Sequence, residues 1–465
     1  MNSIKQIATL AMLALPFAAM AQIAFTGNDR DIFEVTPDNN TGLKKIYVLH
    51  DTEGVGMSYR ATSMNPVTWF TYGEGGGGYA QELLNVIDDP SDPYVSSIAQ
   101  VEPERGYIIE EGTTRHYIWV TDYSRYPLHL ATIEADEDGD CNTVTLHVEG
   151  SGNDIPYYTI TGARRILSRD LKLSYNNLLW DDEGDDEGEN EDYNEPKPVT
   201  DVISGFKPVI VMPAPVCDTD FTLKGDRFME FWGEDQTIGS NFWHTSAVEV
   251  HTTAVQEERD NKNEIKSQGV ELGGSAPCHI TFSSFCSDAV VHKEWQMATD
   301  QDFNNIVLRL NQDEVEETFD DAGTFYWRFI GSNEDGTCES YSDVYTVNIG
   351  VSELHCPNVF TPGTTEGDND IWYVSYKSIT EFHCVIFNRW GNKMIELNDP
   401  SQGWDGRYNG KLVPAGVYYY VIKAMGSDGQ KYNLTGDINI IRYKLMNTGG
   451  DDNGTTVVDP PSGGE

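Results

Sequence analysis

The chain has 465 residues, of which 75 are acidic and 31 basic, and its formal net charge at pH 7 is −44. Such an excess of negative charge would repel phosphate, so the composition argues strongly against a nucleic-acid-binding protein. Aromatic residues make up 11% of the sequence, which is enough large side chains for the cores of the three or four domains that the length suggests.

Residues 1–21 have the pattern of a secretory signal peptide. Lys5 supplies the positive start, residues 7–17 the apolar run, and Ala19-Met20-Ala21 the cleavage site. The apolar run is too short to span a membrane, so we expect cleavage and a soluble, exported mature chain that begins at Gln22.

Residues 22–123 are predicted to form the first β-sandwich domain. Strand-like stretches rich in β-branched and aromatic residues lie at 45–50, 67–72, 106–110 and 114–120. A glycine-rich run at 73–78 separates two of them. No Lys-Ser/Thr pair and no helical pattern follows, so we interpret it as a flexible hairpin loop and not as a phosphate-binding loop.

Residues 124–272 are predicted to form a second β-sandwich domain. Residues 143–148 alternate apolar and polar side chains, as a half-buried strand does. Nine of the twelve residues 181–192 are acidic, so we expect a disordered loop at 181–196. The spacing of these carboxylates does not fit an EF-hand, and we predict no metal site there. Residues 267–277 look like a linker.

Residues 273–351 show the clearest immunoglobulin-like pattern. Trp295 is a candidate core residue of an inner strand. Phe325, Trp327 and Phe329 alternate with polar or smaller side chains and are predicted to share one face of another strand.

Residues 352–445 are predicted to form a C-terminal β-sandwich, followed by a disordered tail at 446–465 that is rich in Gly, Asp and Pro. Its strand-like stretches at 371–376, 382–389, 417–424 and 438–442 are separated by Asp-Gly and Asn-Gly turns. This region holds ten acidic and nine basic residues, a net charge of −1, so almost all of the chain's negative charge lies outside it. A near-neutral domain on an acidic body suits a docking module.

A set of short motifs runs through this C-terminal region in a fixed order. The residues are Pro357, Asn358, Phe360, Pro362, Asn388, Arg389, Trp390, Gly391, Trp404, Asp405, Gly406, Gly416, Tyr418 and Gly436. The stretch resembles the gliding-motility-associated C-terminal domain of Bacteroidetes, which is the type B sorting signal of the type IX secretion system. The resemblance implies export by the type IX secretion translocon, a location at the cell surface or outside the cell, and an outer-membrane protein of the SprF/PorP kind as partner.

An internal repeat links the last two domains. Gly323 precedes Gly336 by 13 residues, and Gly416 precedes Gly429 by the same number. We infer one corner-strand-hairpin unit in both places, although common hairpin patterns could produce the same spacing. In the second copy, Tyr418 is placed to bond back to the backbone as a tyrosine corner.

Seven cysteines in an exported protein suggest disulfides and one unpaired thiol. Spacing does not determine the pairing. Our hypothesis pairs Cys356 with Cys384, Cys286 with Cys338, and Cys141 with Cys217, and it leaves Cys278 free.

No metalloprotease, nucleophile-elbow or P-loop motif occurs, and the sequence predicts no catalytic residue and no cofactor. His355-Cys356 and His383-Cys384 contain two zinc-type ligands each. Because neighbours on a strand point to opposite faces, we favour a disulfide over a zinc site. A glycosidase carboxylate pair remains an open alternative.

The sequence therefore predicts an all-β chain of tandem immunoglobulin-like sandwiches that ends in a sorting domain. The expected function is a non-enzymatic cell-surface or secreted protein whose upstream sandwiches bind an unknown surface ligand, either protein or glycan. In this interpretation the motif residues chiefly hold the shape of the sorting domain. The alternatives are an accessory or signalling component of the type IX secretion or gliding machinery, and a hydrolase.

Overall fold

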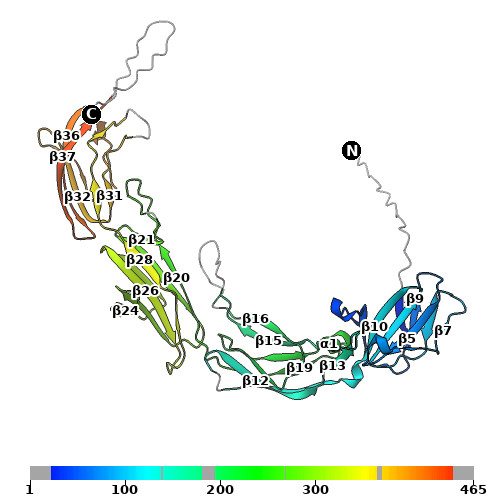
Figure 1. Ribbon diagram of the computed structural model, residues 1–465. Helices are drawn as coiled ribbons and strands as arrows, with labels where there is room; N and C mark the ends of the chain where they lie inside the picture. The colour runs from blue at the N-terminus through cyan, green and yellow to red at the C-terminus, as the bar shows by residue number, and fades with distance from the viewer. Residues whose placement is uncertain are drawn as a thin grey trace, which may run out of the picture. The chain divides into compact units, whose positions relative to one another are not determined.

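The computed structural model is all-β, as the sequence predicted (Figure 1). It describes residues 22–137, 140–180, 193, 195–267, 269–363 and 369–442, so the expected signal peptide, most of the acidic loop and the tail lie outside the described residues. The chain divides into two units, Met1–Val248 with Ser287–Ala289, and Glu249–Cys286 with Val290–Glu465. No helix in the described ranges is long and apolar enough to cross a membrane.

The first sandwich consists of a four-stranded and a six-stranded sheet that enclose a core around Trp69 and Ile109. β3 and β10 pair in parallel, and the other strand pairs of the two sheets are antiparallel. The sheets are, in order, β1 (Gln22–Thr26), β4 (Gly56–Arg60), β8 (Val95–Ile98) and β7 (Ile87–Asp88); and β2 (Phe33–Val35), β3 (Lys45–Leu49), β10 (Thr114–Asp122), β9 (Arg105–Glu111), β5 (Val67–Tyr72) and β6 (Gln81–Glu82). Short 3₁₀ turns lie at Asn39–Thr41, Gly77–Tyr79 and Tyr123–Arg125.

A carboxylate at the end of β9 organises one edge of this sandwich. Glu111 is 6% exposed, and its oxygens accept hydrogen bonds from the Tyr59 hydroxyl at 2.7 Å and from the backbone and hydroxyl groups of Thr62 and Ser63 at 2.7–3.2 Å. Burial by itself would raise the pKa of Glu111, but the hydrogen bonds from Ser63, Thr62 and Tyr59 outweigh it and lower the pKa to about 2. The ionised side chain therefore holds the 62–63 turn against β9.

The second sandwich packs directly on the first. Its sheets are β11 (Leu128–Ala135), β12 (Thr143–Gly152) and β17 (Val209–Pro213); and β16 (Lys197–Ile203), β15 (Leu171–Asn177), β18 (Thr222–Gly225) and β19 (Gln236–Gly239). A hairpin of β13 (Ile155–Tyr158) and β14 (Arg164–Leu167) and the helix α1 (Arg227–Trp232) complete it. One hydrophobic cluster runs from Val48 and Trp119 of the first sandwich to Leu146 and Phe221 of the second, so the two share a core.

The glycine-rich run at 73–78 lies where the first sandwich packs on the second. The Gly77 amide donates to the Ile160 carbonyl at 2.8 Å. Gly76 has a φ of 76°, and a Cβ at this position would lie 2.4 Å from the backbone nitrogen of Gly162. Glycine is therefore required here for a close approach of two backbones. The run connects the β5–β6 hairpin, as expected, and it is hydrogen-bonded to the second sandwich.

A buried ion pair lies in the same unit. Arg169 and Asp226 are each 1% exposed, and the Arg169 Nε donates to an Asp226 oxygen at 2.7 Å. The other Arg169 donors reach the carbonyls of Asn153 and Tyr126 and the hydroxyl of Tyr123 at 2.8–2.9 Å. Asp226 also caps α1, because its second oxygen accepts from the amides of Phe228 and Met229 at 3.1 and 3.0 Å.

The third sandwich belongs to the second unit and is built around Trp295. This side chain is fully buried, and its ring lies 5.0 Å from Phe329 and 6.3 Å from Trp327, as the sequence pattern predicted for a core tryptophan. The sheets are β20 (Val250–Gln256), β22 (Cys278–Cys286) and β25 (Glu314–Phe319); and β21 (Leu272–Gly274), β28 (Tyr345–Ile349), β26 (Gly323–Ser332), β23 (His292–Ala298) and β24 (Ile306–Leu310), with β27 (Glu339–Tyr341) paired to β26.

The predicted boundary between the second and third domains at residue 272 is wrong. β20 pairs with β22 over residues 250–256, so the third sandwich begins some twenty residues earlier than expected. The expected linker at 267–277 contains β21, which pairs in parallel with β28. The boundary is set by the pairing of β20 with β22 across a long loop. The local composition of the sequence does not reveal that pairing.

The C-terminal domain has a core of its own, formed by residues between Leu354 and Ile440. Its main sheet is β30 (Val359–Phe360), β37 (Lys431–Ile440), β36 (Gly416–Gly426), β32 (Ile379–Asn388) and β33 (Lys393–Leu397). Two smaller pairs are β29 (Glu353–His355) with β31 (Ser375–Lys377), and β34 (Arg407–Tyr408) with β35 (Lys411–Leu412).

A loop of the third sandwich is hydrogen-bonded to this domain. The Ile265 amide donates to the Tyr376 carbonyl at 2.8 Å, and the Tyr376 amide donates to the Asn263 carbonyl at 3.1 Å. The Asn263 side-chain amide also donates to the carbonyls of Val374 and Pro400, each at 2.8 Å. Residues 261–265 therefore border β31 and add backbone hydrogen bonds to it.

The glycines of the internal repeat have similar conformations in both copies. Gly323 opens β26 with a φ of 157°, and Gly416 opens β36 with a φ of 142°. Thirteen residues later, the hairpin glycines Gly336 and Gly429 have φ values of 68° and 74°. The shared corner-strand-hairpin unit is therefore confirmed.

The expected disulfides are wrong. Cys217, Cys286, Cys356 and Cys384 are free thiols, as is Cys278, and the disulfide-bonded cysteines are Cys141 and Cys338. Each expected pair therefore contains at least one free thiol. Cys384 is fully buried in the core of the C-terminal domain, where burial raises its pKa to about 12. Pairing depends on which Cβ atoms the fold brings within bonding distance, and sequence spacing does not contain that information.

The buried ion pair leads to a prediction for stability. Arg169→Met leaves the Asp226 carboxylate buried without a counter-charge, which typically costs about 3 kcal/mol or more. We expect amide hydrogen exchange around 123–130 and 226–232 to become at least about a hundredfold faster by local opening. The exposed Arg165→Met is the matched control and should leave exchange unchanged. Equal exchange rates in both variants would show that the Arg169–Asp226 pair does not stabilise this region.

Glu111 leads to a prediction for pH. Its folded pKa of about 2 lies below the ordinary value, so its contribution to stability is complete above about pH 4.3 and is lost as the pH falls toward 2. Glu111→Gln should lower the thermal stability of the first sandwich at neutral pH. The difference in thermal stability between Glu111→Gln and the wild type should become smaller as the pH falls from about 4.3 to about 2. The exposed Glu82→Gln should have the thermal stability of the wild type at every pH. A stability difference between Glu111→Gln and the wild type that does not change with pH would contradict the proposed role of the ionised Glu111.

Candidate functional site

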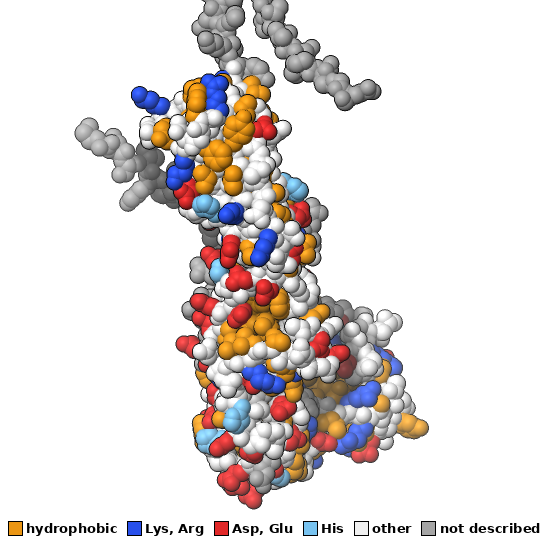
Figure 2. Space-filling model, turned by 90° about the vertical axis from the view of Figure 1, so that its left-hand side faces the viewer, with side chains coloured by type: hydrophobic (Ala, Val, Ile, Leu, Met, Phe, Trp, Pro, Cys, Tyr) orange, Lys and Arg blue, Asp and Glu red, His pale blue; other side chains and the backbone are white. Residues whose placement is uncertain are grey.

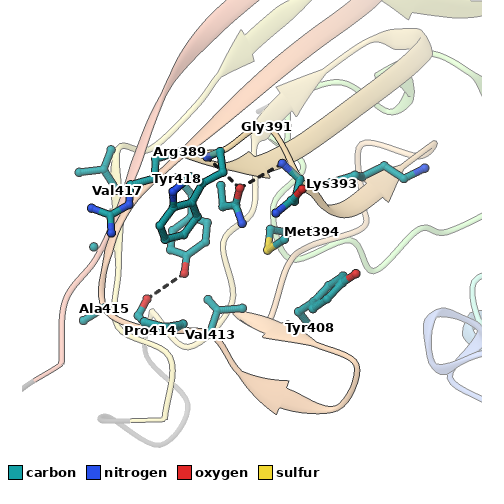
Figure 3. Close-up of a pocket in the computed structure, with 14 residues that line it drawn as sticks. Arg389, Gly391, Lys393, Met394, Tyr408, Val413, Pro414, Ala415, Val417 and Tyr418 are labelled. Carbon is teal, nitrogen blue, oxygen red and sulfur yellow. Dashed lines mark hydrogen bonds between the residues drawn. The ribbon is translucent and has the colours of Figure 1, made fainter.

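A pocket of about 850 Å³ opens at one end of the C-terminal sheet (Figure 3). Its walls are the turn at 388–392, the start of β33, Tyr408 of β34, and the corner at 413–418 that leads into β36. Among the motif residues predicted from the sequence, the structure brings six together here: Asn388, Arg389, Trp390, Gly391, Gly416 and Tyr418.

The turn between β32 and β33 is held by its own side chains. The Asn388 Oδ1 accepts from the backbone amides of Trp390 and Asn392, both at 3.0 Å. Gly391 adopts a φ of 81°, and its amide donates to the Asn388 carbonyl at 2.9 Å. Asn388 and Gly391 therefore hold the shape of the domain, as the sequence predicted.

Arg389 and Trp390 have a different role in the turn. Trp390 is 70% exposed, and the Arg389 guanidinium carbon lies 4.3 Å from the centroid of its ring, in a cation–π contact. Neither residue belongs to the hydrophobic core of the domain. Our expectation that they chiefly hold the domain's shape is not supported by these contacts.

The opposite wall of the pocket is a tyrosine corner. Tyr418 is 6% exposed, and its hydroxyl donates to the Pro414 carbonyl at 2.9 Å, which is the back-bond that the sequence predicted (Figure 3). Burial raises the pKa of Tyr418, so the hydroxyl stays protonated and acts as the donor. Gly416 takes the positive φ that turns the chain into β36.

Trp404 fills the core behind this corner. It is fully buried, its ring lies 5.2 Å from Tyr418 and 5.5 Å from Phe360, and its Nε1 donates to the Arg407 carbonyl at 3.0 Å. Asp405 accepts from the Arg407 amide at 3.0 Å, and a Cβ on Gly406 would lie 2.8 Å from a side-chain carbon of Pro362. These residues support the pocket from behind and do not line it.

The remaining motif residues lie elsewhere in the domain. The Pro357 carbonyl accepts from the Trp372 Nε1 at 2.6 Å, and the Asn358 carbonyl accepts from the Asn439 amide at 2.8 Å. Gly436 leaves room for Tyr420, because a Cβ there would lie 2.4 Å from the Tyr420 hydroxyl.

Several residues of the pocket were not predicted from the sequence, including Lys393, Met394, Tyr408 and Val413. Lys393 pairs with Glu396 at 2.7 Å, and Glu396 also accepts from His383 at 2.9 Å. The hydrogen bonds from Lys393 and His383 lower the pKa of Glu396 to about 2, so it stays ionised. Among the residues that the structure describes, no Asp or Glu lines the pocket itself.

The doubled His-Cys pattern does not converge on one point. His383 contacts Glu396, whereas His355 is exposed and lies 3.7 Å from Glu353. Cys356 and Tyr420 both pack against the hydrophobic core of the domain. Within the described residues, no group of three or more His, Cys, Asp or Glu side chains is placed to hold a metal ion.

Comparisons with known proteins agree with this geometry. Residues 354–440 match the CHU_C type IX secretion signal domain, and residues 132–240 match a fibronectin type III domain. No curated protein matches the chain.

Solved structures with some similarity include a tetra-tandem repeat from the extending region of a large adhesion protein. It is 10% identical, the match covers 84% of this chain and 96% of that one, and the TM-score is 0.21. The three N-terminal domains of the highly immunogenic outer capsid protein of bacteriophage RB49 are 9% identical, with 69% of this chain and 100% of that one covered and a TM-score of 0.20.

The resemblance that the motif residues carried is thus confirmed for the same stretch of the chain. Residues 354–440 are a CHU_C type IX secretion signal domain with a fibronectin type III domain upstream of it, and the protein is exported to the cell surface or the extracellular space.

Proposed function

We propose that this is a non-enzymatic surface protein, which the type IX system exports through its C-terminal domain and whose upstream sandwiches bind a protein or glycan ligand outside the cell. The observation that carries the proposal is the agreement of two boundaries. The hydrophobic cluster of the C-terminal domain runs from Leu354 to Ile440, and the signal-domain match spans 354–440. The export signal is thus a folded module with its own core.

The upstream sandwiches support a binding role. Immunoglobulin-like and fibronectin type III sandwiches are common scaffolds of cell-surface proteins, in which loops at the ends of the sheets contact partners. For the C-terminal domain, we propose an outer-membrane protein of the SprF/PorP kind as the partner during export.

The proposed function leads to a prediction for export. A chain lacking residues 352–465 should accumulate in the periplasm of a host with a type IX system, because it has lost the folded signal. The measurement is the fraction of protein that added protease or antibody reaches on intact cells. The full-length chain and a second type IX cargo in the same cells are the controls. Normal display of the truncated chain would rule out the C-terminal domain as the signal.

The second prediction separates a surface binder from a part of the secretion machinery. Deleting the gene should reduce attachment of cells to surfaces or to other cells, while the export of other type IX cargo stays at the wild-type level. Proteomics of the culture medium and of the cell surface measures both. A general loss of exported cargo would instead favour the accessory role, and turnover in a screen of polysaccharides and peptides would favour a hydrolase.

A further inference from the structure

We propose that the pocket around Arg389 and Trp390 is the surface through which the signal domain is recognised, and that its partner is an extended acidic protein segment with apolar side chains. This inference rests on the proposed function and adds the site and the chemistry of the partner. Arg389 and Trp390 are among the residues that carry the family resemblance, yet neither is part of the core. A structural role therefore does not explain them.

The charge of the pocket indicates an acidic partner. The whole chain carries 75 acidic and 31 basic residues, but the described residues that line this pocket include Arg389 and Lys393 and no carboxylate. Lys393 is already paired with Glu396. Arg389 forms no ion pair within the described part of the chain, and its contact is the ring of Trp390. An acidic segment would be repelled by most of the molecule and attracted here.

One face of the molecule shows the same difference in charge between the C-terminal domain and the rest of the chain. In Figure 2 the C-terminal domain presents mainly hydrophobic and basic side chains, whereas acidic side chains gather on the part of the chain before it. A guanidinium stacked on an indole keeps its donor edge available for a carboxylate. The cation–π contact therefore orients Arg389 without neutralising it.

The exposed apolar side chains indicate that the partner also brings hydrophobic groups. Trp390, Tyr408 and Val417 are 70%, 45% and 42% exposed, and all three line the pocket. Tryptophan, tyrosine and arginine are the residues that most often dominate binding energy in protein interfaces. Since the Asn388 side chain fixes the turn, the backbone of Trp390 is held in place before any partner arrives.

The strand order indicates an extended partner. β33 begins in the pocket at Lys393 and is the last strand of its sheet, since among the described strands it pairs with β32 alone. An edge strand offers backbone groups to an added strand, so side chains of the added segment would alternate toward and away from the pocket. A segment that alternates acidic and apolar residues fits both the basic and apolar lining of the pocket and the edge strand beside it.

Export of full-length variants tests the inference in cells. Arg389→Glu and Trp390→Ala should reduce surface display at least about tenfold, toward the level of the 352–465 truncation. The matched controls are Lys423→Glu and Tyr419→Ala, which change an exposed cation and an exposed aromatic on β36 that do not line the pocket. Both controls should be displayed as the wild type is. Equal protease resistance of all four purified variants would show that they fold.

The outcomes separate this inference from the proposed function. If the truncated chain is trapped but Arg389→Glu and Trp390→Ala are displayed normally, the pocket is not the recognition surface and the export role stands. If the truncated chain is itself displayed, the proposed function fails first. Equal losses in the pocket variants and in the controls would also overturn the inference.

A second measurement tests the chemistry of the partner with the mature chain, residues 22–465. The probes are synthetic peptides that alternate Asp or Glu with Leu or Phe, and matched peptides with Asn and Gln instead of the acids. We expect the acidic peptides to bind at least about tenfold more tightly, and Arg389→Glu and high salt to remove that preference. Equal binding of both peptide series, or no binding of either, would overturn an acidic partner segment.

Discussion

The C-terminal domain depends on the packing around Trp404. This fully buried side chain contacts Phe360 from the first strand of the main sheet and Tyr418 from its middle, and its indole binds the Arg407 carbonyl. It therefore joins the loop before β34 to the edge strand β30 and to the central strand β36 of the sheet. The other tryptophan of the motifs, Trp390, lies outside this core and is 70% exposed.

Local patterns in the sequence were sufficient for the elements that local chemistry determines. The stretch at 417–424 lies within β36, and the stretch at 382–389 lies in β32 up to Asn388, since alternating β-branched and aromatic residues favour a half-buried strand. The 13-residue glycine spacing predicted two equivalent hairpins, and the position of Tyr418 predicted its bond to the backbone. Of the candidate site, the turn at 388–391 and the tyrosine corner were predicted, although Arg389 and Trp390 were given a structural role.

Features that depend on distant contacts were not accessible from the sequence. The partners of Arg169 range from Tyr123 to Asp226, and the pairing of β20 with β22 crosses a loop of more than twenty residues. The disulfide partners were wrong for the same reason. Tyr408 was missed because a two-residue strand is too short to show a period. The first two sandwiches share a core, which domain-by-domain analysis of a sequence cannot show.

The hydrogen bonds from residues 261–265 to β31 bear on the use of this signal as a fusion tag. A graft that begins at residue 352 would carry the complete core but leave the backbone groups of Tyr376 and Val374 without the Ile265 and Asn263 groups that satisfy them. A heterologous cargo joined there would present a bare strand edge to the periplasm. Extending the graft back to residue 249 would bring the third sandwich and its covering loop with it, and would deliver the signal in the form in which this chain carries it.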